Sequence, residues 1–159
     1  MKKALASIAL ALLLAATLTA QERNFASGFG GEVNNNSEKG AAGGVVMASD
    51  FTFKKLPIAV GLSLALSTSG KGNGVLEPTG MFRWYFLGKR DGIFLQGDLG
   101  LVCIKDESKG KAFTDFLPLA GLRAGYRLNF LEAVYVEPYG RVGIPFIWGL
   151  GLMVGLRYQ

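Results

Sequence analysis

The sequence predicts an all-β protein, an antiparallel up-and-down transmembrane β-barrel of about eight strands. Three observations predict it. The chain has 23 glycines, all after residue 20, and each glycine inside a helix costs about 1 kcal/mol relative to alanine. Large apolar residues alternate with small or polar ones over segments of about ten residues. The breaks between these segments alternate between longer polar loops and tight turns, as in a barrel with two different ends.

The first 20 residues predict a cleaved signal peptide that precedes the barrel. Lys2 and Lys3 form a basic start, an apolar run follows, and the small residues Thr19 and Ala20 mark the cleavage site. The alternative is a membrane-anchoring helix, but the apolar run at 4–16 is short for a span of about 20 residues. We therefore expect residues 1–20 to be a signal peptide and residues 21–159 to form one β-barrel domain.

The strands are read from an alternation with a period of two residues. Six segments show it clearly, at 57–69, 76–87, 92–104, 118–130, 133–144 and 148–158. Two weaker segments precede them, at 24–33 and 41–53. Pro118 and Pro138 interrupt the pattern, since each lacks a backbone donor. We expect each to form a bulge, or the strand to begin late, after Pro118.

The polar loops lie at 34–40, 69–74 and 105–112, and the tight turns at 54–57, 88–92 and 129–132. This alternation matches a membrane barrel with long outer loops and short periplasmic turns. The last outer loop, at 144–146, is the exception because it is unusually short.

The composition of the two faces predicts which one lies inside. The apolar face carries Leu, Val, Ile and Phe, whereas the other carries mostly glycine, alanine and a few charged residues. A soluble barrel would place lysine, glutamate and serine on its polar face, so the pattern favours lipid outside and a narrow wet lumen inside. Aromatic residues near both ends of the strands form the predicted membrane girdle: Phe51, Phe53, Trp84, Phe86, Phe116, Tyr126, Trp148 and Tyr158.

The inner face is expected to carry luminal ion pairs. The candidates are Arg83, Asp98, Arg123, Glu137, Arg141 and Arg157. Counting back from the turn at 88–92 places Arg83 opposite Asp98 or Gln96, and counting from the turn at 129–132 places Arg123 opposite Glu137. Tyr85, Tyr135 and Tyr139 share this face and are expected to fill the lumen with the charged residues.

The signal peptide, the amphipathic strands and the ending "GLGLMVGLRY" together resemble the small outer-membrane β-barrels of the OmpA-transmembrane-domain, OmpX and OmpW type. The resemblance extends over the whole mature chain as a pattern. It implies an outer-membrane location and a last strand that the barrel-insertion machinery reads. Leu152, Val154, Leu156 and Tyr158 would then be the insertion signal, although Gln159 follows the aromatic residue that usually ends such chains.

The residue types exclude several functions. The chain has no histidine, so serine–histidine and cysteine–histidine catalysis and most zinc sites are absent. We expect no enzyme activity, no catalytic residues, no cofactor and no metal. A single cysteine, Cys103, excludes an internal disulfide. The net charge of +5, which includes the two lysines of the signal peptide, is too mild to indicate nucleic-acid binding.

The expected function is therefore that of a monomeric, side-chain-plugged scaffold in outer-membrane lipid, with a structural or surface-interaction role. Two alternatives remain. One is a narrow channel or lateral conduit for small solutes, which the resemblance to OmpW implies. The other is a soluble exported barrel that binds a small ligand.

Overall fold

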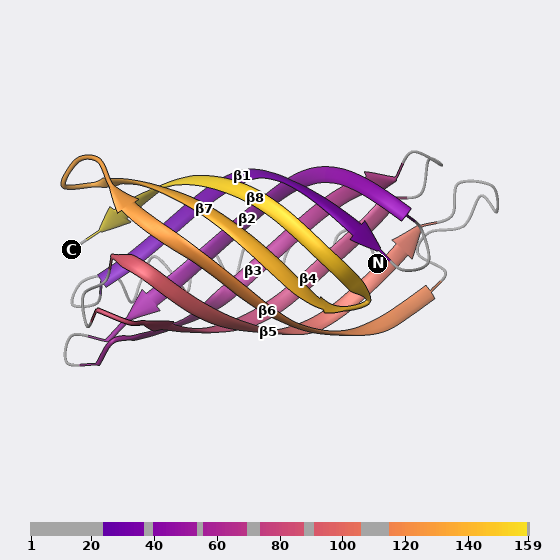
Figure 1. Ribbon diagram of the computed structural model, residues 1–159, viewed down its shortest axis with the longest axis horizontal. Helices are drawn as coiled ribbons and strands as arrows, with labels where there is room; N and C mark the ends of the chain where they lie inside the picture. Colours follow the sequence, from indigo (N-terminus) through magenta and orange to yellow (C-terminus); the bar gives the residue numbers. More distant parts are fainter. Residues whose placement is uncertain are drawn as a thin grey trace, which may run out of the picture.

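Eight antiparallel strands close into a barrel in the computed structural model, which describes residues 24–36, 40–53, 56–69, 74–87, 91–105 and 115–158 (Figure 1). The strands are β1 (Asn24–Asn36), β2 (Gly40–Thr52), β3 (Ile58–Ser69), β4 (Gly74–Tyr85), β5 (Gly92–Lys105), β6 (Asp115–Asn129), β7 (Val134–Ile144) and β8 (Phe146–Tyr158). The predicted fold class is confirmed. The predicted signal peptide lies outside the described residues. No helix in the described part of the chain is long and apolar enough to span a bilayer.

Each strand pairs with its neighbours in the chain, and β1 pairs with β8 to close the barrel. The closing register places Phe25 opposite Tyr158 and Gly30 opposite Met153. Closure gives every strand a partner on both sides, so the sheet has no edge strand. The strands meet at two ends, which we call the turn end and the loop end. The turn end is the end at which β2, β4, β6 and β8 finish, and it carries the short turns that follow β2, β4 and β6.

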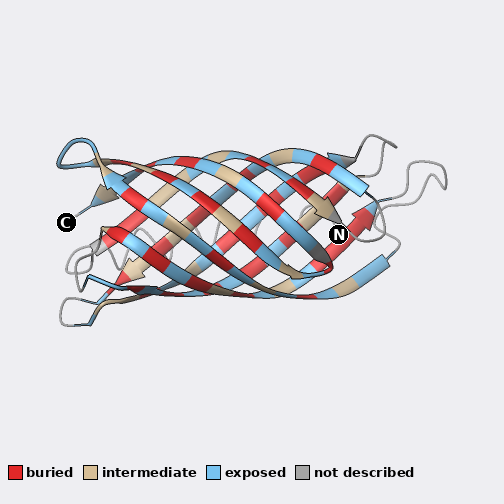
Figure 2. Ribbon diagram, in the orientation of Figure 1, coloured by how far each residue is buried: buried red, intermediate tan, exposed pale blue. Residues whose placement is uncertain are grey.

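Buried and exposed residues alternate along every strand, as the colours of Figure 2 show. The exposed face carries the large apolar residues, and the buried face carries glycine, alanine and the charged side chains. These are the two faces that the sequence alternation predicts. The strand positions that point inward also hold most of the large buried side chains, among them Arg83, Arg123, Arg127, Tyr85 and Tyr135.

Two tyrosines of β7 explain why the inner face of β8 carries glycine. A Cβ atom on Gly151 would collide with the ring of Tyr139, and one on Gly155 would collide with the ring of Tyr135. Gly28 of β1 lies under the same Tyr135 hydroxyl. Glycine is therefore needed at these positions because the tyrosine rings lie flat across the neighbouring backbone.

The prolines are accommodated differently from the prediction. β6 begins at Asp115, so the predicted late start after Pro118 is wrong. The register is the same on both sides of each proline, so neither forms the predicted bulge. Pairing between β6 and β7 begins only at Ala120, beyond Pro118, and it is interrupted beside Pro138. The ladder thus tolerates Pro138 by omitting pairs without shifting the strands.

Candidate functional site

The charged side chains of the lumen form two clusters. The turn-end cluster comprises Asp50 (β2), Arg83 (β4), Gln96 (β5), Arg127 (β6) and Glu137 (β7). The loop-end cluster comprises Glu32 (β1), Glu77 (β4), Asp98 (β5), Arg123 (β6) and Arg141 (β7). All ten side chains are buried. Each lies on a strand, so the barrel wall fixes its position.

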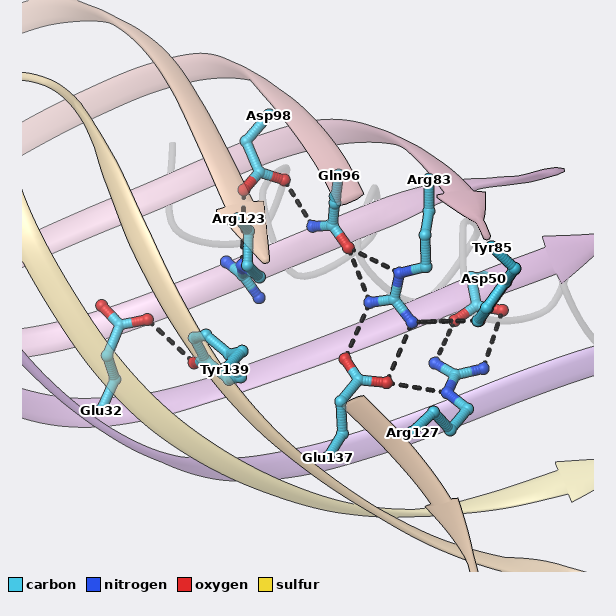
Figure 3. A network of polar contacts seen from close by, with 10 residues as sticks. All are labelled: Glu32, Asp50, Arg83, Tyr85, Gln96, Asp98, Arg123, Arg127, Glu137 and Tyr139. Carbon is cyan, nitrogen blue, oxygen red and sulfur yellow. Dashed lines mark hydrogen bonds and ion pairs between the residues drawn. The ribbon is translucent and has the colours of Figure 1, made fainter. Parts of the chain in front are cut away.

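Glu137 is the centre of the turn-end cluster (Figure 3). Arg83 donates two hydrogen bonds to it, from Nη2 to Oε1 at 2.8 Å and from Nη1 to Oε2 at 2.9 Å. Arg127 adds a third, from Nε to Oε2 at 2.7 Å. Charge-assisted bonds of this forked geometry are among the strongest in proteins. Three strands, β4, β6 and β7, are tied together across the lumen by one carboxylate.

Asp50 and Gln96 complete the turn-end cluster. Arg127 donates from Nη2 to Asp50 Oδ2 at 2.7 Å, and Arg83 Nη1 lies 3.6 Å from the same oxygen. Gln96 accepts from Arg83 Nε at 2.8 Å and donates to Asp98 at 2.6 Å. The glutamine thereby connects the two clusters (Figure 3). Two carboxylates balance two guanidinium groups here, so this part of the lumen is electrically neutral.

Aromatic rings cover the flat faces of the guanidinium groups. Arg83 lies 4.0 Å from the ring centre of Phe94, and Arg127 lies 4.2 Å from that of Tyr135. Cation–π contacts of this kind become stronger when water is excluded. Rings and ion pairs therefore lie packed together inside the barrel at the turn end.

The loop-end cluster is more loosely bonded. Arg141 Nη2 bridges Glu32 and Glu77, at 3.0 Å from Glu77 Oε2. Tyr139 donates its hydroxyl to Glu32 at 2.8 Å. Arg123 lies over the Tyr139 ring at 4.4 Å, but its Nε is 3.4 Å from Asp98 and makes no hydrogen bond to the described residues.

Several buried polar atoms of the loop-end half have no hydrogen-bond partner among the described residues. They include Glu77 Oε1, Ser67 Oγ and Arg123 Nη1. Unsatisfied buried polar groups are costly, and ordered water or an ion commonly satisfies them. The loop-end half is therefore the part of the lumen that has polar groups available for a small ligand.

An apolar cluster lies inside the barrel at the loop end, beside the charged groups. Val75 (β4), Val102 and Ile104 (β5) and Leu119 (β6) are buried together, with Leu117 packed against them. These side chains cover the inner face of β4, β5 and β6 at this end of the barrel.

Five of the six predicted ion-pair candidates lie buried in the lumen: Arg83, Asp98, Arg123, Glu137 and Arg141. Arg157 does not join them. It lies at the turn end, partly exposed, and donates to the carbonyl of Glu132 at 3.3 Å.

The register prediction is right for one pair and wrong for the other. Arg83 lies opposite Gln96. Arg123 lies opposite Arg141, so its predicted pairing with Glu137 is wrong. The reason is the turn between β6 and β7. β6 continues to Asn129 and the chain turns over residues 130–133, closed by a hydrogen bond from Phe130 N to Val134 O at 3.0 Å. The true turn lies further along the chain than the sequence count assumes.

Sequence reasoning missed four charged members of the clusters: Glu32, Asp50, Glu77 and Arg127. Glu77 and Arg127 lie on the polar side of strands whose alternation is clear, so the same rule could have included them. Glu32 and Asp50 belong to the two weaker segments, where glycine blurs the alternation.

The predicted girdle residues lie on the outer face, in two groups. Phe51, Phe53, Trp84, Phe86, Tyr126 and Tyr158 are at the turn end, and Phe116 and Trp148 are at the loop end. Phe25, which was not predicted, packs between Phe51 and Tyr158 with ring centres 5.0 and 6.0 Å away. Leu152, Val154 and Leu156 line the outer face of β8 beside Tyr158. No group of three potential metal ligands of the His, Cys, Asp or Glu type occurs within the described ranges.

Comparison with known proteins gives similar structures but no close sequence. No protein-family model matches the chain, and no curated protein matches its sequence. The N-terminal β-barrel domain of Pseudomonas aeruginosa OprF is similar with a TM-score of 0.59 and 14% identity, over 87% of this chain and 98% of that one. Neisserial surface protein A is similar with a TM-score of 0.57 and 11% identity, over 86% of this chain and 96% of that one.

A third similar structure is Ail, the attachment invasion locus protein of Yersinia pestis, in complex with the heparin analogue sucrose octasulfate. It has a TM-score of 0.50 and 13% identity, over 87% of this chain and 99% of that one. At these identities the similarity concerns the backbone arrangement. The chain has the fold of the small outer-membrane β-barrels.

Proposed function

We propose that the protein is an integral outer-membrane barrel with a closed lumen, a non-enzymatic scaffold with a structural or surface-interaction role. The observation that carries the proposal is the turn-end cluster, in which Arg83, Arg127 and Glu137 are at most 2% exposed and bonded to one another across the barrel.

The outer face supports a membrane location. Large apolar side chains are exposed on all eight strands, from Phe29 on β1 to Leu156 on β8. Soluble monomers rarely expose apolar patches larger than a few hundred Å². A belt that encircles the barrel suits lipid, and it disfavours the soluble exported barrel that sequence reasoning left open.

The lumen supports a closed barrel in preference to a channel. A barrel of eight strands encloses a space that side chains can just fill. Here buried arginines and aromatic rings occupy it at the turn end. Breaking such a buried ion pair typically costs about 3–5 kcal/mol, so the cluster is expected to stay closed.

The remaining parts of the proposal follow from the residue types. The absence of histidine supports a non-enzymatic role without a catalytic site or cofactor. The strand proposed to be recognised by the insertion machinery is β8, through its outer face and its last residue, Tyr158. The partners are then outer-membrane lipid and that machinery, with no nucleic acid, and the barrel is a monomer because closure leaves no strand edge.

Planar-bilayer recording tests the closed lumen. We expect purified, refolded protein to insert without a steady single-channel current, and detergent alone supplies the baseline. A reproducible open level that depends on protein concentration would contradict the closed scaffold and favour the narrow channel. Insertion itself is checked on the same material by its resistance to alkaline extraction from vesicles.

A further inference from the structure

The loop-end cluster has one more carboxylate than it has guanidinium groups. Asp98 pairs with Arg123 at 3.4 Å. Among the described residues, Glu32 and Glu77 both pair with the guanidinium group of Arg141. An unbalanced charge inside a protein is costly unless a counter-charge accompanies it. The described residues of this half of the lumen therefore carry one negative charge that no side chain of the cluster balances.

The unbalanced charge is at Glu77. Glu32 is fully bonded, since it accepts from Tyr139 and Asn34 as well as pairing with Arg141. Arg141 reaches Glu77 only through Oε2, and Glu77 Oε1 is buried without a hydrogen-bond partner. Among the described carboxylate oxygens of the loop-end cluster, this one alone is buried without a hydrogen-bond partner.

A second buried oxygen without a partner belongs to a diagonal neighbour of Glu77 on the adjacent strand. Ser67 on β3 is 7% exposed, and its Oγ has no hydrogen-bond partner among the described residues. The β3–β4 register places Ala65 opposite Glu77, and Ser67 is the next inward residue toward the loop end. Diagonal neighbours of this kind lie about 7–8 Å apart, and both side chains are buried on the inner face of the barrel.

We propose that Glu77 Oε1 and Ser67 Oγ bind one monovalent metal cation, with Na⁺ as the test ion. Carboxylate and hydroxyl oxygens are the ligands that hard cations prefer. Ca²⁺ takes six to eight oxygens, usually from several carboxylates, and no group of three such ligands exists in the described strands and turns. A monovalent ion that keeps part of its water shell fits the two oxygens and supplies the missing positive charge.

Thermal unfolding in detergent tests the site without requiring conduction. Its result is therefore independent of whether the lumen is closed. The folded protein is heated at one pH in NaCl or in N-methyl-D-glucamine chloride of equal ionic strength. An ion that binds only the folded state raises Tm, by an amount on the order of 3 °C for a chain of this size. Ser67→Ala and Glu77→Gln should lose this difference.

Ser63→Ala is the matched control. Ser63 is an inward serine of the same strand, and its hydroxyl is not among the unsatisfied atoms. This variant should keep the Na⁺ effect. Equal wild-type Tm in the two salts would overturn the proposal, as would an effect that survives in Ser67→Ala. The series is then repeated at a lower pH. A wild-type Tm that rises at the lower pH and is equal in the two salts would overturn the proposal, because a proton and not a metal cation would then balance Glu77.

A second measurement uses only the wild-type protein, so it tests the site even if the variants do not fold. The ²³Na transverse relaxation rate of a NaCl solution should rise when folded wild-type protein is added, and KCl should reverse the rise by competition. A rate equal to that of detergent alone would contradict the site regardless of how the variants behave.

Discussion

At the scale of single residues, contacts across the lumen determine which side chains the strands can carry. Tyr135 and Tyr139 of β7 lie across the backbone of β8, where Gly155 and Gly151 leave space for their rings. This is why the last strand combines a row of large apolar residues with a row of glycines. A glycine of the outer face is under no such constraint: a Cβ on Gly43 would have no atom within 4 Å.

The glycine contacts give the first prediction. Gly151→Ala and Gly155→Ala should each lower the free energy of unfolding by about 1–3 kcal/mol, because overpacking forces the tyrosine to move. Gly43→Ala is the control and should be neutral or slightly stabilising. Urea unfolding in lipid vesicles measures all three. Equal effects at the inner and outer glycines would show that the tyrosine contacts do not constrain β8.

The second prediction concerns the partner of Glu137. A double-mutant cycle of Glu137→Ala with Arg83→Ala should show strong coupling, because removing either one leaves the other charge buried and costs about 3–5 kcal/mol. The same cycle with Arg123→Ala is the control and should be nearly additive, since Arg123 pairs with Asp98. Coupling to Arg123 in place of Arg83 would favour the register that the sequence count predicted.

At the scale of elements, strands were predicted well and the register only where the turn was placed correctly. The alternation identified the inner and outer faces, and the turn at 88–92 placed Arg83 opposite Gln96. The turn between β6 and β7 was misplaced because β6 continues to Asn129. The alternation of apolar and polar residues does not show where a strand ends when the residues after it are also apolar, as Phe130 and Leu131 are.

The last strand gives the third prediction. Deleting Tyr158 together with Gln159 should impair insertion far more than deleting Gln159 alone. Tyr158 is paired with Phe25 in the closing register and stacks on its ring at 6.0 Å. Tyr158→Phe should insert normally because it keeps the ring. The measurement is the amount of protein recovered in the outer-membrane fraction, and normal recovery of both truncations would remove the role assigned to Tyr158.

At the scale of the whole molecule, several ion pairs inside the barrel join strands that are not neighbours. Arg83 on β4 binds Glu137 on β7, and Arg127 on β6 binds Asp50 on β2. The sequence predicts that these residues face inward, but pairs that cross the lumen depend on the curvature and stagger of the closed barrel. Hairpin counting reaches only adjacent strands, so it could not find these pairs.

We expect the apolar face of the closed barrel to contact lipid, with its aromatic girdle at both ends. Trp84 and Trp148 test it because both lie on the outer face, about half exposed, one at the turn end and one at the loop end. In vesicles whose lipid chains carry bromine near the headgroup, both tryptophans should lose most of their fluorescence, and bromine near the chain ends should quench less, since interfacial residues lie at headgroup depth.

Single-tryptophan proteins, made by Trp84→Phe or Trp148→Phe, separate the two ends of the barrel in this measurement. In both proteins we expect strong quenching by the shallow bromine label and little quenching by acrylamide in the water. A lipid-facing barrel would be contradicted if acrylamide quenched the tryptophan fluorescence and brominated lipid did not.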